Sequence, residues 1–240
     1  MSGMRLNKFI GETGLCSRRE ADELIAAGRV TLDGAVAVAG AKWVEGMAVC
    51  VDGKEIKRKP AAKNRRRHVY IALNKPVGIT CTTDTADASN IVDFIDHQER
   101  IFPIGRLDKD SEGLILLTSN GDIVNRILRA ENNHEKEYLV GVNKPVTEEF
   151  LRTMARGVHI HRQLTKPCKV SKLAKYGFRI TLTQGLNRQI RLMSEALGYK
   201  VVQLRRVRII NVKLGTLKPG AWRNLSDAEL AGLLPDFKDW

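Results

Sequence analysis

The chain has 240 residues, of which 43% are hydrophobic, enough to bury the core of one large domain or two smaller ones. No run of about 18 apolar residues occurs and the N-terminus lacks the apolar core of a signal peptide, so we expect no transmembrane helix and a cytoplasmic location. The net charge of +13 favours a polyanionic partner. Nucleic acid is favoured over a membrane surface, because no basic amphipathic helix with exposed aromatic residues is recognisable.

The cysteine and histidine residues give little support for a metal site. Four cysteines occur, and no two of them form a CxxC pair or stand beside a histidine at ligand spacing: Cys16, Cys50, Cys81 and Cys168. His159 and His161 share a face if their segment is a strand, but two histidines without a third ligand are a weak metal site. We predict free thiols in a reducing compartment and no bound metal.

Residues 1–56 have the pattern of a small separate domain. The stretch RLNKFIGETG carries apolar residues at helical spacing and ends on glycine. A second helix is expected to begin at Ser17, because Glu20, three positions later, completes a capping box. Asp33 and Gly34 follow between alternating apolar residues, which is typical of a β-hairpin.

Residues 57–68, KRKPAAKNRRRH, contain seven Lys or Arg and no acidic residue. A block of like charges repels itself and favours an extended chain. We interpret it as a basic linker, either a plain tether or a segment that also contacts phosphates.

From residue 69 onward the composition becomes globular. Strands are predicted in VYIALNK, IFPI, GLILLTS, KEYLVGV, FRITLTQ and VVQLRRVRII, and helices in NIVDFI and NGDIVNRILRA. Because strands and helices do not alternate regularly, a doubly wound parallel fold is not expected. The prediction is an α+β domain over residues 69–240, with a mixed, mainly antiparallel β-sheet flanked by helices and loops.

The stretch GRLDKDSEG, residues 105–113, places Asp108, Asp110 and Glu112 at alternate positions of a basic chain. An extended segment would put the three carboxylates on one side. A calcium loop is disfavoured, because the twelve-residue pattern ending in Glu is missing and the flanks are predicted strands. A glycosidase pair needs a defined carboxylate separation, which sequence does not supply, and aromatic platforms for a sugar are scarce at 5%.

The N-terminal stretches RLNKFI, CSRREADELIAAGRVTLDG and MAVCVDG resemble the S4 RNA-binding domain. The resemblance implies that the two helices present basic side chains to structured RNA, and by position these are Arg5, Lys8, Arg18 and Arg19. The alternative is a solvated helix face, which is how most surface charge is interpreted. For the set of four, contact with phosphates is favoured.

Three further stretches occur in order: LNKPVG at 73–78, GRLDKDSEGLILLTSNGD at 105–122 and QGLNRQIRLM at 184–193. With the S4-like module, they resemble the pseudouridine synthases of the RsuA type over nearly the whole chain. The stretches HEKEYLV, KPVTEEF and GAWRNLSDAEL resemble the RluF group, which acts on large-subunit ribosomal RNA. Some members of the family continue with a basic tail after the point where this chain ends.

The resemblance implies uridine-to-pseudouridine isomerisation with no cofactor and no metal, and it places the catalytic carboxylate on Asp108. It implies that Arg191 is the ion-pair partner of this carboxylate and that Tyr138 packs on the uracil, although a core role for Tyr138 stays open. Residues expected beside the RNA or the flipped base are Arg106, Leu107, Lys109, Arg188, Gln189 and Ile190. Lys75 with Pro76 is interpreted either as part of the site or as a turn with a solvated lysine.

The expected partner is a structured RNA stem-loop, most directly 23S ribosomal RNA, bound by a monomer. Transfer RNA or small-subunit ribosomal RNA remain alternatives with the same chemistry. A non-catalytic S4-type RNA-binding or ribosome assembly factor is the alternative from another class, and it gives no reason for GRLD and RQIR to occur together.

Overall fold

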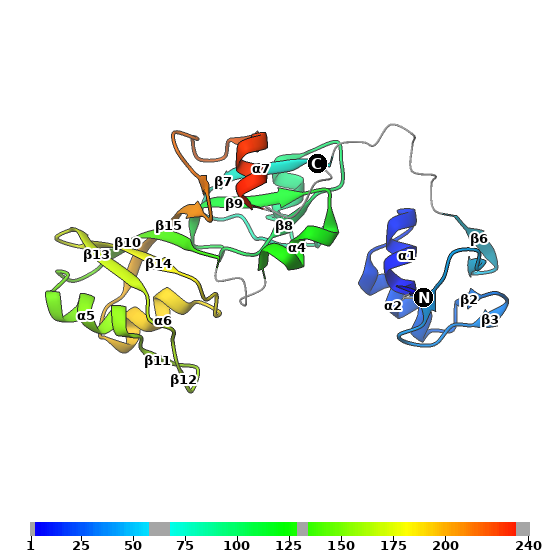
Figure 1. Cartoon of the computed structure of the whole chain (residues 1–240), viewed down its shortest axis with the longest axis horizontal. Helices are drawn as coiled ribbons and strands as arrows, with labels where there is room; N and C mark the ends of the chain where they lie inside the picture. The colour runs from blue at the N-terminus through cyan, green and yellow to red at the C-terminus, as the bar shows by residue number, and fades with distance from the viewer. Residues whose placement is uncertain (1–2, 58–67, 129–133, 234–240) are drawn as a thin grey trace. The chain divides into compact units, whose positions relative to one another are not determined.

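The computed structural model describes residues 3–57, 68–128 and 134–233. The chain divides into two compact units, Met1–Arg66 and Arg67–Trp240 (Figure 1). The linker predicted at 57–68 falls almost wholly outside the described residues. No helix in the described ranges is long and apolar enough to cross a bilayer.

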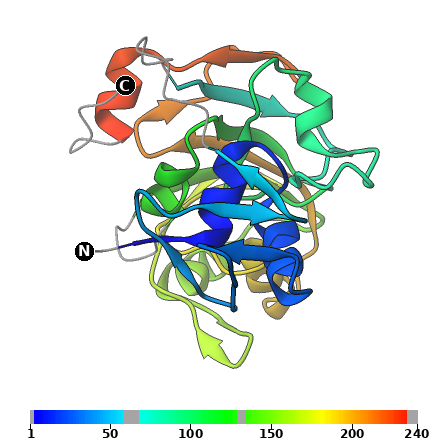
Figure 2. The ribbon, with the colours of Figure 1, turned by 90° about the vertical axis from the view of Figure 1, so that its right-hand side faces the viewer.

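The N-terminal unit packs two helices, α1 (Leu6–Thr13) and α2 (Arg18–Ala26), with short strands (Figure 2, blue). The strands are β1 (Met4–Arg5), β2 (Val30–Leu32), β3 (Ala35–Val36), β4 (Lys42–Trp43), β5 (Val49–Val51) and β6 (Lys54–Ile56). Strands β3-β2-β5-β6 form one sheet, and β1 pairs with β4. The predicted capping box is present, because Ser17 and Glu20 each accept a hydrogen bond from the other's backbone N–H. The predicted hairpin joins β2 to β3 through Asp33 and Gly34, both at positive φ.

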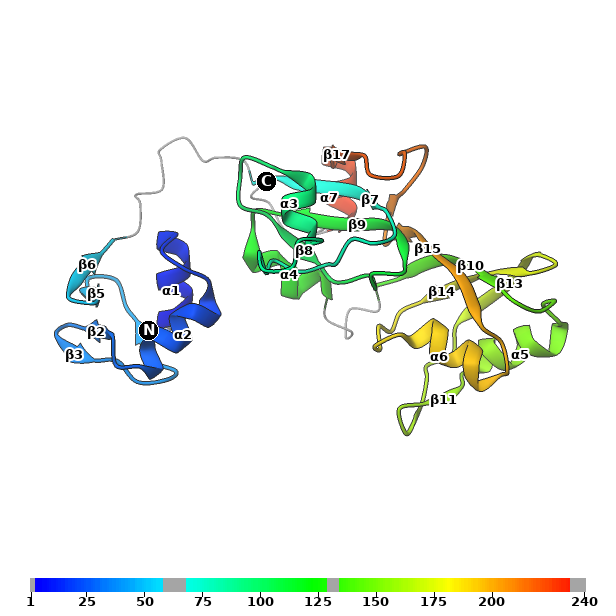
Figure 3. The ribbon, with the colours of Figure 1, turned by 180° about the vertical axis from the view of Figure 1, so that it is seen from behind.

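The C-terminal unit is built on a nine-stranded sheet (Figure 3). Its strands are β7 (Tyr70–Lys75), β8 (Phe102–Ile104), β9 (Glu112–Thr118), β10 (Lys136–Val142), β13 (Lys169–Ala174), β14 (Gly177–Leu182), β15 (Val201–Ile209), β16 (Val212–Lys213) and β17 (Trp222–Asn224). The main order is β13-β14-β10-β15-β9-β7-β17, with β16 beside β15 and β8 beside β9. Only the β15–β9 pair is parallel among these described pairings, which confirms the mixed, mainly antiparallel α+β fold.

Helices cover the sheet on both faces of the half that contains β7 and β9. The helices of this unit are α3 (Ile91–Ile95), α4 (Gly121–Leu128), α5 (Glu148–Arg156), α6 (Gln189–Ala196) and α7 (Asp227–Leu233). Ile115 and Leu117 of β9 pack with α3, whereas Leu114 and Leu116 pack with α4 and α7. A strand covered on both faces reads as a continuous apolar run, and this explains LILL in the sequence.

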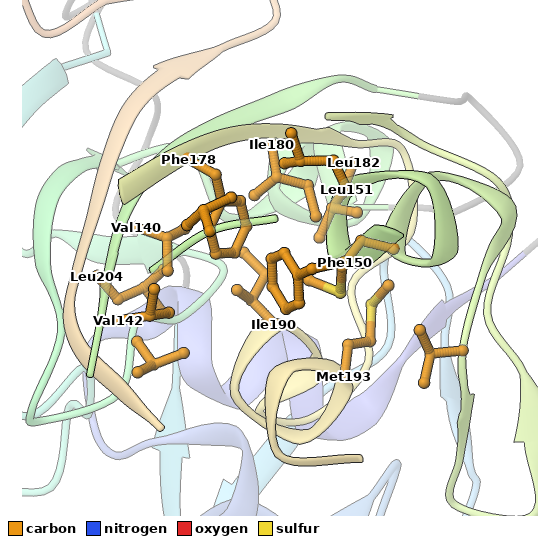
Figure 4. Packing of buried hydrophobic residues seen from close by; sticks show 14 of the residues in the cluster. Val140, Val142, Phe150, Leu151, Phe178, Ile180, Leu182, Ile190, Met193 and Leu204 are labelled. Carbon is orange, nitrogen blue, oxygen red and sulfur yellow. The ribbon is translucent and has the colours of Figure 1, made fainter. Parts of the chain in front are cut away.

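The other half of the sheet has a separate core beneath α5 and α6. Phe150 of α5 meets Phe178 of β14 edge-to-face, with 5.2 Å between ring centroids. Ile190 and Met193 of α6 complete this cluster against Val140 of β10 (Figure 4). A short hairpin, β11 (His159–Ile160) and β12 (Gln163–Leu164), follows α5. The packing of Ile190 and Met193 in this apolar cluster therefore fixes the position of α6 on the sheet.

The two halves meet where β15 lies between β10 and β9. Strand β15 pairs with β9 at two positions only, Arg205 with Glu112 and Arg206 with Gly113. Gly113 has φ of 105°, and a Cβ atom there would overlap the backbone carbonyl of Arg206. Glycine is therefore required where the two strands approach, directly after the loop that contains Asp108.

Candidate active site

Asp108 lies in the loop between β8 and β9, residues 105–111, called here the Asp108 loop. The N–H of Ser111 donates to the carbonyl of Asp108 (3.0 Å), so the segment turns. The three acidic residues consequently do not form the one-sided row that an extended segment would give. Contacts from outside the loop hold its backbone; among them, the N–H of Leu107 donates to Sγ of Cys81 (3.3 Å), and the N–H of Gly78 donates to the carbonyl of Lys109 (2.8 Å).

Two arginines at the start of α6 face this loop. Arg188, the N-cap residue of α6 with φ of 49°, places Nη1 3.4 Å from Oδ2 of Asp108. Arg191 lies one turn further along, and its Nε is 4.0 Å from the same oxygen. The structure thus brings together Asp108 and Arg191, 83 positions apart in sequence. It also places Arg188, expected to contact the RNA backbone, nearer to the carboxylate than Arg191.

Arg191 is held mainly by the backbone and by Asp110. Its side chain is 12% exposed, and Nη2 lies 3.2 Å from Oδ2 of Asp110 and donates to the carbonyl of the same residue. Nη2 also donates to Oγ of Ser111, and Nη1 to the carbonyl of Val201. These fixed acceptors match the donor geometry of the planar guanidinium, so the orientation of Arg191 is set before RNA arrives.

Asp110 is not among the site residues expected from the sequence, yet the structure gives it a place in the site. It contacts both arginines, since Nη1 of Arg188 lies 3.6 Å from its Oδ1. The available signal was the DxD spacing across a turn combined with two arginines three positions apart on a helix. Glu112 belongs to β9 instead, where its carboxylate accepts a hydrogen bond from Gln203 (2.8 Å).

Tyr138 lies in β10, beside the point where the two halves of the sheet meet. Its ring packs against the cores of both halves. Cζ of Arg206, on the neighbouring strand, is 6.0 Å from the centre of this ring. Arg206 itself is only 3% exposed, a position that sequence reasoning missed. An aromatic ring at this junction can stack on a planar base.

Lys75 is fully buried, which corrects the interpretation of a solvated lysine in a turn. Its Nζ donates to the carbonyls of Pro76 (2.9 Å) and Ile79 (2.8 Å). Burial lowers the pKa of Lys75, while the nearby Cys81, Asp108 and Asp110 favour its charged form. Lys75 therefore shapes the segment whose Gly78 supports the Asp108 loop.

The residues expected to contact RNA separate into exposed and buried groups. Arg106 and Lys109 are exposed on the Asp108 loop, and Arg188 is 45% exposed. Leu107, Gln189 and Ile190 are buried. Oε1 of Gln189 accepts from the N–H of Leu186 (3.1 Å), so its amide orders the start of α6. Leu107 and Ile190 belong to the apolar clusters of the two halves.

The model of the RNA pseudouridylate synthase family matches residues 69–196, and the S4 domain model matches residues 4–39. The chain belongs to the RNA pseudouridylate synthase family. It is 56% identical to the dual-specificity RNA pseudouridine synthase RluF of Escherichia coli over 97% of this chain and 79% of that protein. The ribosomal small subunit pseudouridine synthase A of Salmonella typhimurium is 34% identical over 96% of this chain and all of its own length.

A solved structure agrees with this assignment. The crystal structure of a pseudouridylate synthase superposes with a TM-score of 0.70 at 32% identity, covering 96% of this chain and 99% of that one. The resemblance to RsuA-type synthases and the prediction of an enzyme are thereby confirmed. This pseudouridine synthase isomerises uridine to pseudouridine in RNA.

The S4 domain of this synthase presents most of its expected basic residues to solvent. Arg5 precedes α1, and Arg18 and Arg19 open α2, all three of them exposed. Lys8 is half-buried and lies 3.7 Å from Glu12 one turn along α1. Across the residues that the structure describes, no group of three or more potential metal ligands occurs.

Proposed function

We propose that this synthase modifies a uridine of 23S ribosomal RNA and that Asp108 is its essential carboxylate. The observation that carries the proposal is the position of Asp108. It lies in a loop held by hydrogen bonds to its backbone, and it faces the guanidinium groups of Arg188 and Arg191. A carboxylate that must act in a closed site needs adjacent positive charge to stay ionised, because desolvation favours its neutral form.

The isomerisation requires three events at one base. The N-glycosidic bond breaks, the uracil turns while it stays bound, and C5 bonds to the sugar carbon. Asp108 can capture the electron-poor sugar carbon as an ester that C5 then displaces, or remove a sugar proton that is later returned. In both routes the proton lost from C5 balances the proton gained at N1, so no co-reactant is needed. The target base must first leave its stack, which costs a few kcal/mol and least in a loop or bulge.

Other residues have separate roles in this proposal. Arg191 orients the carboxylate of Asp108, and Tyr138 stacks on the turned base. Arg106 and Lys109, both exposed on the Asp108 loop, meet the RNA around the flipped nucleotide. Arg188 contributes to both tasks, since it lies near Asp108 and remains partly exposed.

The RNA substrate is inferred from the relatives and from the S4 domain. The Escherichia coli relative is named as a dual-specificity enzyme, and we infer that this synthase also accepts two RNAs. Arg5, Lys8, Arg18 and Arg19 hold the stem of such an RNA through its phosphates. Transfer RNA and small-subunit ribosomal RNA are the other candidate substrates.

The organisation of the chain completes the proposal. We place the RNA-binding domain at 1–56, the basic linker at 57–68 and the catalytic domain at 69–240. The two-unit division near residue 66 supports the separation of the domains. The enzyme acts as a cytoplasmic monomer and requires no cofactor.

The test is conversion of RNA fragments by wild-type protein, Asp108→Asn and the control Asp227→Asn. Asp227 is an exposed acid in the first turn of α7, so its substitution leaves the Asp108 loop untouched. Fragments of 23S, small-subunit and transfer RNA are incubated separately, and pseudouridine is mapped in each. We expect wild type and Asp227→Asn to form pseudouridine on the 23S fragment and on one of the other two RNAs, and Asp108→Asn to form none. Equal product from Asp108→Asn would contradict the role of Asp108, and product confined to another RNA would contradict the substrate.

A further inference from the structure

Arg206 occupies an unusual position for a charged residue. It is 3% exposed in the middle of β15, where its backbone lies between Tyr138 of β10 and Gly113 of β9. Within the described residues, no carboxylate forms an ion pair with it. Burying a guanidinium without a carboxylate is unfavourable for folding, so such a residue calls for an explanation.

The donors of Arg206 reach the backbone on either side of Asp108. Nε donates to the carbonyl of Leu114 (2.6 Å), just after the Asp108 loop. Nη1 donates to the carbonyl of Arg106 (3.4 Å), two residues before Asp108. The guanidinium thus spans both ends of the segment that carries the carboxylate.

The same guanidinium also reaches Tyr138. Its Cζ lies 6.0 Å from the centre of the tyrosine ring, on the strand paired with its own. Its Nη2 is buried and has no hydrogen-bond partner among the residues that the structure describes. Arg206 is therefore a shared neighbour of the Asp108 loop and of the ring expected to stack on the base.

Two other backbone contacts of the loop come from the segment that follows β7. The segment after β7 holds Leu107 through Cys81 and Lys109 through Gly78. Arg206 supplies the contact from β15, the strand that joins the two halves of the sheet. The loop is thereby fixed to both halves, one carrying α3 and the other carrying Tyr138.

We propose that Arg206 is a positioning residue of this synthase. Through its contacts, the buried guanidinium holds the Asp108 loop and the ring of Tyr138 at a fixed separation. The proposal rests on the catalytic role of Asp108 proposed above. Arg206 acts through these residues and does not itself contact the base. Misplacement of a reacting group by about 1 Å can slow a reaction about 100-fold, so a loosened loop should affect the rate far more than RNA binding.

The test compares Arg206→Met and Arg206→Lys with the matched controls Arg205→Met and Arg205→Lys. Arg205 is the adjacent residue of β15 and is less buried, and its side chain points to the opposite face of the sheet. The single-turnover rate constant at saturating RNA, the RNA dissociation constant and the unfolding midpoint are measured for each full-length variant. The substrate is an RNA that the wild-type protein converts.

We expect Arg206→Met to lower the rate constant about 100-fold while the dissociation constant stays within about threefold. Arg206→Lys keeps the charge but loses the fork of donors, so we expect partial rescue, to about a tenfold loss. The Arg205 variants should stay within about threefold of wild type in both quantities. If Arg206 only stabilised the fold, its loss would not lower the rate constant of the folded protein while leaving the RNA dissociation constant unchanged.

Four outcomes would overturn the proposal. They are a wild-type rate for Arg206→Met, equal losses for the Arg205 and Arg206 variants, a loss of rate matched by an equal loss of RNA affinity, or failure of both Arg206 variants to unfold cooperatively. The last outcome would make Arg206 a residue of fold stability only. Failure of the proposed function is distinguishable, because it appears as product from Asp108→Asn or as no product from wild type on any tested RNA.

Discussion

Nε of Arg191 lies 4.0 Å from Oδ2 of Asp108, whereas Nη2 of the same arginine lies 3.2 Å from Oδ2 of Asp110. The shorter contact is thus to the acid that is not catalytic in our proposal. Within the described part of the protein, Nε of Arg191 is also without a hydrogen-bond partner. Asp110 therefore anchors the guanidinium, and Nε is left to face Asp108, the reacting carboxylate of our proposal.

Substitution of Asp110 should slow the chemical step. In Asp110→Ala, Arg191 loses one ion-pair partner and gains freedom, so we expect about a tenfold lower single-turnover rate constant from the loss of orientation. The control is Glu112→Ala, which removes the contact to Gln203 and should change the rate less than about twofold. A rate for Asp110→Ala equal to or above that of wild type would show that Asp110 only competes with Asp108 for the arginines.

Gly113→Ala should destabilise the catalytic domain. The backbone φ of 105° is unfavourable for alanine, and the added Cβ would overlap the carbonyl of Arg206. We expect the free energy of unfolding, measured in urea, to fall by more than about 1 kcal/mol. Gly121→Ala is the control, because nothing lies within 4 Å of a Cβ at this first residue of α4 and alanine favours helix. Equal stability of the two variants would contradict the close approach of β9 and β15.

Sequence signals between neighbouring residues predicted the helices and strands. The features that these signals missed depend on contacts between residues far apart in the chain. Ser17 and Glu20 specify the start of a helix within four residues, so their capping box could be found in the sequence. The burial of Arg206 could not, because RRVRI reads as a polar strand until β10 and β9 are placed on either side of it.

The candidate site shows the same division. The ordered motifs located Asp108 and Arg191 in the sequence, and the structure brings the two together. The burial of Leu107 and Gln189 depends on packing partners far along the chain, which one sequence does not specify. Residues adjacent to the Asp108 and Arg191 motifs therefore also belong to the core, and their contact with RNA stays a prediction.

The ion pair between Arg223 and Glu229 should make stability depend on pH. Two hydrogen bonds of 2.7 Å from the guanidinium of Arg223 hold the pKa of Glu229 below its usual value. A carboxylate with a lowered pKa in the folded state contributes stability that is present above the unfolded pKa, 4.5, and lost as pH falls through the folded value.

Glu229→Gln should therefore lower the free energy of unfolding by about 1 kcal/mol at pH 7 and by less at pH 3. Urea denaturation at both pH values measures this difference. Glu148→Gln is the control, since Glu148 begins α5 and has no ion pair among the described residues. An equal loss at both pH values would mean that Glu229 acts by packing and not by charge.

Removing the two positive charges at the start of α2 should weaken RNA binding without lowering the rate constant of the isomerisation. Arg18 and Arg19 are exposed there, and each phosphate contact contributes about 0.7 to 0.9 to the slope of log affinity against log salt. For Arg18→Ala with Arg19→Ala, we expect that slope to fall by about 1.5, while the rate constant at saturating RNA stays unchanged. The control is Lys54→Ala, an exposed cation on β6 outside the two helices. If the double variant and the control bind alike at every salt concentration, the basic residues of α2 form a solvated face and the S4 domain holds RNA elsewhere.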